Sequence, residues 1–143
     1  MIRLDFTQEI KAPVVRVFNY VTDLRNAAEW QDGVVESKPV KNARTRVGTK
    51  VKMVRLLMGE RLESMGTVTE FVQNQKFAFR STSGPVRFSM SQTFSAVNGG
   101  TRLETHMEMD PADFIQVSEG VVAASLKQQL SAQEQKLKEI LES

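Results

Sequence analysis

The strongest constraint in this sequence is a long stretch of alternating apolar and polar residues that gives way to a helical pattern near the C-terminus. From Val34 to Met109, apolar side chains recur mostly at every second position, which is the period of a strand with one buried face. After Asp110-Pro111 the alternation stops, and apolar residues recur at helical spacing. A chain with this order is expected to fold as a β-sheet followed by one amphipathic helix.

Turn-forming residues divide the alternating stretch into six predicted strands. Turn signals occur at Lys41-Asn42-Ala43, Met58-Gly59-Glu60, Gln73-Asn74-Gln75, Ser83-Gly84-Pro85 and Asn98-Gly99-Gly100. The last is the strongest hairpin signal, because Asn and Gly accept the positive φ of tight turns. Short connections predict antiparallel neighbours and therefore a meander. The predicted strands are Val34–Val40, Thr49–Leu57, Arg61–Phe71, Phe77–Thr82, Val86–Ala96 and Thr101–Met109.

The residues before this stretch predict one further strand and two short helices. Ile2–Ile10 alternates between apolar and polar side chains, which is typical of a half-buried strand. Pro13 opens a segment of helical apolar spacing, because the first turn of a helix does not need the N–H group that proline lacks. Thr22 or Asp23 can cap a second short helix that runs through Glu29.

The terminal helix is predicted to begin near Pro111–Asp113 and to end at about Leu141. At about 1.5 Å per residue, such a helix spans most of a small domain. The economical packing is an α+β fold, one domain over residues 1–143, in which a curved seven-stranded antiparallel sheet grips this helix. The apolar stripe of the helix consists of Phe114, Ile115, Val122, Leu126, Leu130, Leu137, Ile140 and Leu141.

Composition excludes several classes of protein. The 143 residues are enough to form one hydrophobic core. The chain has 19 Lys and Arg against 17 Asp and Glu, which leaves a net charge of +2, and the two signs are interspersed along the sequence. Nucleic acid is therefore not an expected partner. Cysteine is absent and there is a single histidine, so no metal site is expected. The charged N-terminus and the lack of a run of about 18 apolar residues favour a cytoplasmic protein without a transmembrane segment.

The N-terminal part of the chain carries a motif that resembles a known superfamily. Residues Ile10 to Asp23 fit the pattern I-x-A-P-x-x-x-V-F-x-Y-V-x-D, and Trp30, Gly48 and a hairpin at Gly99-Gly100-Thr101-Arg102 follow. Together with the long terminal helix, these features resemble the polyketide cyclase/dehydrase and lipid-transport superfamily, which has the START or Bet v 1-like helix-grip fold. The resemblance implies a hydrophobic cavity beneath the helix, usually without metal or cofactor, and it names neither a ligand nor a reaction.

The alternation also predicts which strand residues face the helix and could line such a cavity. Phenylalanine and methionine side chains would form its walls, while Gln92 and Thr105 could orient a ligand by hydrogen bonding. Alternatively, these residues simply pack the core. The candidate ligand-binding residues are Phe79, Phe88, Met90, Gln92, Phe94, Thr105, Met107, Val122 and Leu126.

Two basic residues, His106 and Arg55, could place a positive charge in the interior if their side chains faced it. His106 shares its parity with Glu104 and Glu108, which predicts a place on the outer, polar face unless a bulge shifts the register. Arg55 has the parity of Met53, where an unpaired guanidinium is costly to bury unless a carboxylate or an anionic ligand meets it. We therefore expect the strand to twist near Arg55 and to expose it.

Three functions fit these observations. The first is binding of a small hydrophobic or amphipathic molecule between the sheet and the terminal helix. The second is a cyclase or dehydratase type of enzyme, which needs an inward-facing acid–base pair that the alternation does not supply, so no catalytic residue is assigned. The third is a protein-interaction domain, which predicts a filled interior and an exposed apolar patch. The absence of an inward acid–base pair favours the first.

Overall fold

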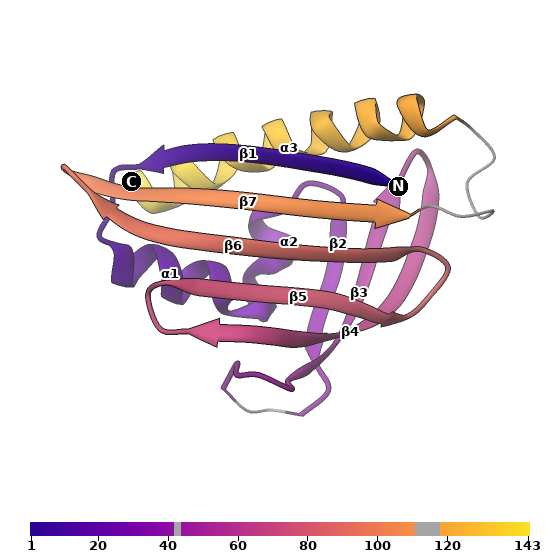
Figure 1. The fold of residues 1–143 in the computed structure, drawn as a ribbon, viewed down its shortest axis with the longest axis horizontal. Helices are drawn as coiled ribbons and strands as arrows, with labels where there is room; N and C mark the ends of the chain where they lie inside the picture. Colours follow the sequence, from indigo (N-terminus) through magenta and orange to yellow (C-terminus); the bar gives the residue numbers. More distant parts are fainter. Residues whose placement is uncertain (42–43, 111–117) are drawn as a thin grey trace.

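Seven antiparallel strands form one curved sheet, and a long helix lies across its concave side (Figure 1). The structure, a computed structural model, describes residues 1–41, 44–110 and 118–143. The strand order is β1-β7-β6-β5-β4-β3-β2, so the strands from β2 onward form a meander and β1 closes against β7. The strands are β1 (Ile2–Ile10), β2 (Val34–Pro39), β3 (Lys50–Leu57), β4 (Glu60–Val72), β5 (Lys76–Ser83), β6 (Arg87–Val97) and β7 (Gly100–Asp110).

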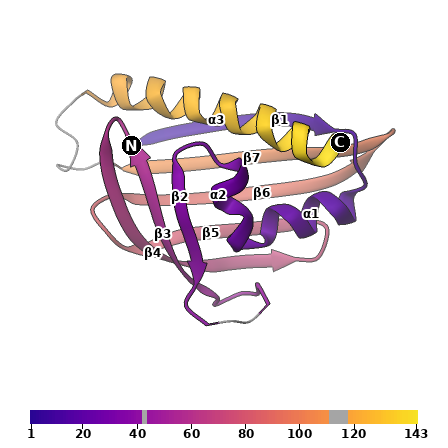
Figure 2. The same ribbon diagram turned by 180° about the vertical axis from the view of Figure 1, so that it is seen from behind.

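The helices all lie on the same side of the sheet (Figure 2). Asp23 caps the segment after α1 as predicted, because its Oδ1 accepts a hydrogen bond from the Arg25 backbone N–H at 3.1 Å. That segment ends at Trp30, one residue beyond the predicted end. The helical elements are α1 (Val14–Thr22), the short 3₁₀ turn η1 (Leu24–Asn26), α2 (Ala27–Trp30) and α3 (Glu119–Glu142).

The predicted strands are confirmed, with β1 matching its predicted bounds and the other bounds differing by at most one residue. The turn predicted at Lys41-Asn42-Ala43 lies partly outside the described residues. The alternation alone did not predict that β1 would pair with β7. This pairing runs from Ile2 opposite Met109 to Ile10 opposite Thr101, and it places the apolar faces of both strands on the concave side.

The terminal helix α3 begins at Glu119, directly after a capping residue that was not predicted from the sequence. Ser118 has extended backbone angles, and its Oγ accepts a hydrogen bond from the Val121 N–H at 3.3 Å. The predicted start at Pro111–Asp113 and the first two residues of the predicted stripe, Phe114 and Ile115, lie outside the described residues. The rest of the stripe is confirmed, with Ile140 half-buried and the others buried, namely Val122, Leu126, Leu130, Leu137 and Leu141.

Two main apolar clusters fill the space between the sheet and the helices. The first lies beneath the C-terminal half of α3 and against α1, where the Phe18 ring meets Phe71 and Phe94 edge-on at centroid distances of 5.3 and 5.0 Å. The second lies beneath the N-terminal half of α3 and contains Leu126 and Met107. No helix in the described part of the chain has both the length and the apolar character that a membrane crossing requires.

Candidate functional site

The nine predicted ligand-binding residues lie on the concave side of the sheet or on the face of α3 that covers it. Phe79 and Phe94 belong to the first cluster. Met107, Val122 and Leu126 belong to the second. Of the remaining four, Phe88 and Met90 are half-buried and Gln92 and Thr105 are buried. The structure thus gathers these side chains around one interior, and their contact with a ligand stays a prediction.

Four buried polar side chains cross this interior between the two apolar clusters. On α3, Gln133 lies between Leu130 of the second cluster and Leu137 of the first. On β7, Thr105 marks the same boundary, and its Oγ1 accepts a hydrogen bond from Gln92 Nε2 at 3.4 Å. We call this set the polar belt; it consists of Gln8, Gln92, Thr105 and Gln133.

The helix and strand that carry two members of the polar belt run alongside each other. At one end the N-terminal ammonium group pairs with Glu119, and at the other the Lys11 backbone N–H donates to Glu142 Oε2 at 3.0 Å. Gln8 and Gln133 both lie in the C-terminal half of the span between these two contacts. The glutamines are therefore at a similar level of the interior, although they are far apart in the chain.

Three amide oxygens of the polar belt lack a partner. Gln8 Oε1, Gln92 Oε1 and Gln133 Oε1 are buried and accept no hydrogen bond from the described protein atoms. A buried acceptor without a donor costs about 1–3 kcal/mol, so such groups usually meet a water molecule or a ligand. The polar belt is therefore a place where a bound molecule with hydroxyl or N–H groups would be held in one orientation.

Gln8 and Gln133 were not predicted from the sequence, although the signal was present. Gln8 has the same parity as the apolar residues of its strand, and Gln133 lies within the six-residue gap between Leu130 and Leu137 in the apolar stripe. A polar residue at a core position of an otherwise regular apolar pattern indicates a buried polar side chain.

Arg55 is buried, so the expectation that its strand would twist and expose it is wrong: the residue is 9% exposed. Its Nη1 donates to Gln129 Oε1 of α3 at 3.2 Å, and its Nη2 donates to Gln31 Oε1, after α2, at 3.4 Å. Burial lowers its pKa to about 10, against the opposing effect of the Asp32 carboxylate. The two amide acceptors come from elements distant in the sequence, so local alternation did not predict that they would make burial tolerable.

A small pocket adjoins Arg55 on the concave side of the sheet. Its volume is about 20 Å³, which is room for one water molecule. The surrounding interior is packed by the side chains of the two apolar clusters. The pocket is lined by Met53, Arg55, Leu62, Ser64, Pro85, Val86, Phe88 and Met109.

Comparison with known proteins assigns the chain to a family. The family model described as polyketide cyclase/dehydrase and lipid transport matches residues 1–142. The chain belongs to this family. The resemblance seen in the N-terminal motif is thereby confirmed. No curated protein matches the chain by sequence.

Solved structures of similar fold support the architecture of this polyketide cyclase/dehydrase and lipid-transport family member. A START superfamily protein from Mycobacterium smegmatis has a TM-score of 0.82 at 12% identity, covering 98% of this chain and 97% of that one. The Zhui aromatase/cyclase from a Streptomyces species has a TM-score of 0.76 at 13% identity, covering 99% and 93%. At such low identities the similarity shows the fold alone.

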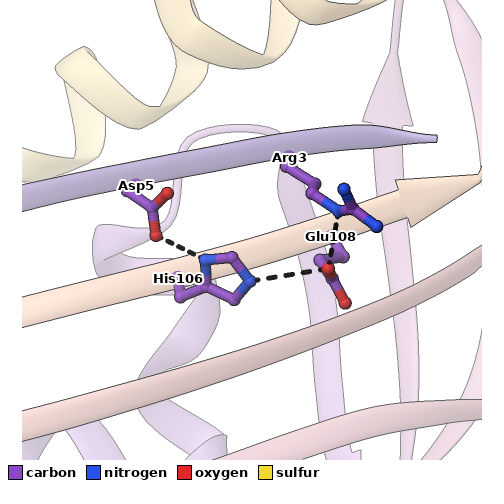
Figure 3. A network of polar contacts seen from close by, with 4 residues as sticks. All are labelled: Arg3, Asp5, His106 and Glu108. Atoms are coloured by element: carbon purple, nitrogen blue, oxygen red, sulfur yellow. Dashed lines mark hydrogen bonds and ion pairs between the residues drawn. The ribbon is translucent and has the colours of Figure 1, made fainter.

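His106 of this family member lies on the outer face of the sheet, as predicted from its parity (Figure 3). Its Nδ1 contacts the Asp5 carboxylate of β1, and its Nε2 lies 3.7 Å from Glu108 Oε1, which also accepts a hydrogen bond from Arg3 Nε at 3.0 Å. Within residues 1–41, 44–110 and 118–143, no group of three or more His, Cys, Asp or Glu side chains is placed to hold a metal ion. The His106 network joins β1 to β7, away from the interior site.

The His106 network predicts a measurable titration. The hydrogen bond and charge of Asp5 raise the pKa of His106 above 6.5. The pKa of His106 is higher in the folded state than in the unfolded state, so protonated His106 stabilises the fold. This stabilisation is fully present below pH of about 6.5 and is lost as pH rises through the folded-state pKa. We expect the single histidine resonance in NMR to titrate above 6.5, and Asp5→Asn to lower that pKa. An unchanged pKa in Asp5→Asn would contradict the contact.

Proposed function

We propose that this protein binds a small hydrophobic or amphipathic molecule between the concave face of the sheet and α3. The observation that carries the proposal is the polar belt, whose three amide oxygens are buried between two apolar clusters without a donor among the described residues. Filling the same positions with apolar side chains would avoid that cost. A ligand with hydroxyl or N–H groups supplies hydrogen-bond donors to these three amide oxygens.

Ligand entry into a well-packed interior requires wall residues that can move. Met53, Met107 and Met109 face this interior, and unbranched methionine side chains change conformation more readily than branched ones. We infer that the ligand displaces these side chains and enlarges the pocket of about 20 Å³ beside Arg55.

The types of polar and charged side chain that are buried favour binding over catalysis. Among the described residues, the buried polar and charged side chains include Gln, Thr, Ser and Arg55 but no Asp, Glu, His or Lys. Proton transfer on a bound substrate usually needs a group whose pKa lies near the working pH, and Arg55, with a pKa of about 10, remains cationic at neutral pH. A cyclase or dehydratase in this interior would have to act by shaping its substrate.

A protein-interaction role is the less favoured alternative, although the packed interior agrees with it. Such a role also predicts a contiguous apolar patch. The large apolar side chains that are exposed in the described residues come from different elements and their connections, namely Met1, Val15, Val35, Val40, Val47, Leu56, Met58, Val72 and Val121. Val40 and Val47 line one surface pocket, and exposed apolar residues in groups this small are common on soluble proteins and need no partner.

Filling the interior is expected to block binding. Met107→Trp places a larger side chain between β7 and α3, at a cost in stability of about 1–3 kcal/mol. We expect the neutral apolar dye Nile red to bind the unchanged protein saturably, with enhanced and blue-shifted fluorescence, and to bind Met107→Trp at least tenfold more weakly. Thermal unfolding of the variant checks that it is folded.

The matched control is Val121→Trp, which makes a similar change on the exposed side of α3, where Val121 is 49% exposed. This variant should bind the dye as the unchanged protein does. Equal binding by both variants would place the dye outside the interior and overturn the proposal. Native mass spectrometry of freshly purified protein would identify any molecule that copurifies in stoichiometric amount.

A further inference from the structure

Arg55 is a buried cation whose partners leave part of its hydrogen-bonding capacity unused. Two of its five N–H groups donate to the oxygens of Gln31 and Gln129. Both acceptors are neutral, and none of the described carboxylates lies within ion-pair distance of the guanidinium. The Asp32 carboxylate acts on Arg55 only from beyond ion-pair distance, so the buried guanidinium remains costly, and an anion beside it would offset that cost.

The neighbours of Arg55 hold the guanidinium in a defined position. Gln129 accepts from Arg55 and donates from its Nε2 to the Leu56 carbonyl oxygen at 2.9 Å, so its amide is held at both ends. Gly33 makes this possible, because a Cβ at that position would lie 2.6 Å from Gln129 Nε2. The guanidinium on β3 is thus bound both by Gln31, which directly follows α2, and by Gln129 of α3.

The pocket beside Arg55 is apolar except for one hydroxyl. Ser64 is the other polar residue among those that line it, and the walls include Met53, Phe88 and Met109. Met109 belongs to the second cluster and Phe88 packs against both main clusters, whereas Met53 belongs to a small third cluster that Phe88 also contacts. The pocket therefore places a fixed positive charge at one end of the apolar interior.

We propose that Arg55 binds the carboxylate of the ligand, and that the ligand is a largely apolar molecule whose single carboxylate is present in addition to the hydroxyl or N–H groups that the polar belt would bind. This inference rests on the proposed function, because it names the ligand class of the same interior site. A carboxylate matches the planar donor fork of a guanidinium with two parallel N–H to oxygen bonds. A phosphate is disfavoured, because its second charge would need a further cation and Arg55 is the one charged residue among those that line this pocket.

The test compares an acid with the alcohol of the same chain length. Decanoate and 1-decanol are titrated at pH 7.5 against the full chain with Nile red bound, and dye displacement reports the affinity of each. We expect decanoate to bind at least tenfold more tightly than 1-decanol. Arg55→Met, which keeps the apolar stem and removes the charge, should abolish this preference while the affinity for 1-decanol stays within threefold.

Two further variants test whether the preference depends on the guanidinium fork of Arg55. Arg55→Lys keeps the charge but loses the guanidinium fork, so it should retain part of the preference for decanoate over 1-decanol. If Arg55→Met does not fold, comparison of Arg55→Lys with the unchanged protein tests the role of Arg55. Arg61→Met is the control, since Arg61 is exposed on β4 and pairs with Glu63 at 3.1 Å. This variant should bind both compounds as the unchanged protein does.

The possible outcomes separate the two proposals. Equal affinity for decanoate and 1-decanol in the unchanged protein would overturn the role of Arg55 and leave interior binding standing. A preference that persists in Arg55→Met would also overturn it, because a residue that merely ties α3 to the sheet would not alter the choice between the two compounds. Failure of Nile red, decanoate and 1-decanol to bind at all would overturn both proposals.

Discussion

Replacing Leu126 by Ala is expected to lower the free energy of unfolding by about 3–5 kcal/mol. Leu126 lies on α3 in the second cluster, is 0% exposed, and shares that cluster with Met107 and Val122. The change removes buried apolar surface and leaves a cavity that rigid strands on one side cannot fill by collapse. Urea denaturation followed by circular dichroism measures the effect.

The control for Leu126→Ala is Lys127→Ala, one position along the same helix. Lys127 is exposed, and alanine favours helix, so its replacement should change the free energy of unfolding by less than about 0.5 kcal/mol. Similar losses in both variants would mean that the face of α3 assigned to the core is wrong. A loss confined to Leu126→Ala supports the apolar seam along which the proposed ligand would lie.

Gly100→Ala is expected to destabilise the fold by about 3 kcal/mol. A Cβ at Gly100 would lie 2.2 Å from the Ile10 carbonyl oxygen and 3.1 Å from the Lys11 Cα, both of which are backbone atoms. Side chains could turn away from such a clash, whereas backbone atoms require the end of β1 to separate from β7. Thermal and urea unfolding should both show the loss.

The matched control is the same substitution at Gly120, in the first turn of α3. Among the described residues, a Cβ there would meet only the Ser118 Oγ, at 4.0 Å. Since alanine has a higher helix propensity, Gly120→Ala should leave stability unchanged or raise it by up to about 1 kcal/mol. If Gly100→Ala proved as stable as Gly120→Ala, the close approach of β1 to the hairpin would be incorrect.

Local patterns were sufficient to predict most of the fold. Period-two alternation and turn residues located the strands within one residue, because most side chains on the buried face of a strand are apolar. The same parity placed His106 outside and the seven candidate strand residues inside, and helical spacing did the same for Val122 and Leu126. The helix start was less well predicted, because apolar spacing says little about caps and Ser118 was overlooked.

The candidate site was predicted less completely than the fold. Its apolar walls follow from parity, so Phe94 and Met107 were found, whereas the glutamines Gln8 and Gln133 were assigned no role. The exposure of the Arg55 side chain was predicted wrongly, because its hydrogen-bond acceptors lie 24 and 74 positions away in the chain. Pairings of that range depend on how elements pack and are not encoded in any local period.

The amino-acid sequence by itself determined the order of the elements, the buried face of each and the membership in a family whose fold has a sheet closed over a terminal helix. The order of the elements and their buried faces follow from local periodicity and turn chemistry, which act over a few residues, whereas the family membership follows from the match of the whole sequence to the family model. Only the tertiary structure decided that β1 pairs with β7, that a polar belt divides the core, and that the Arg55 charge is enclosed by neutral amides beside an apolar pocket. Each of these depends on groups brought together from distant parts of the chain, because burial and hydrogen bonding are satisfied in space.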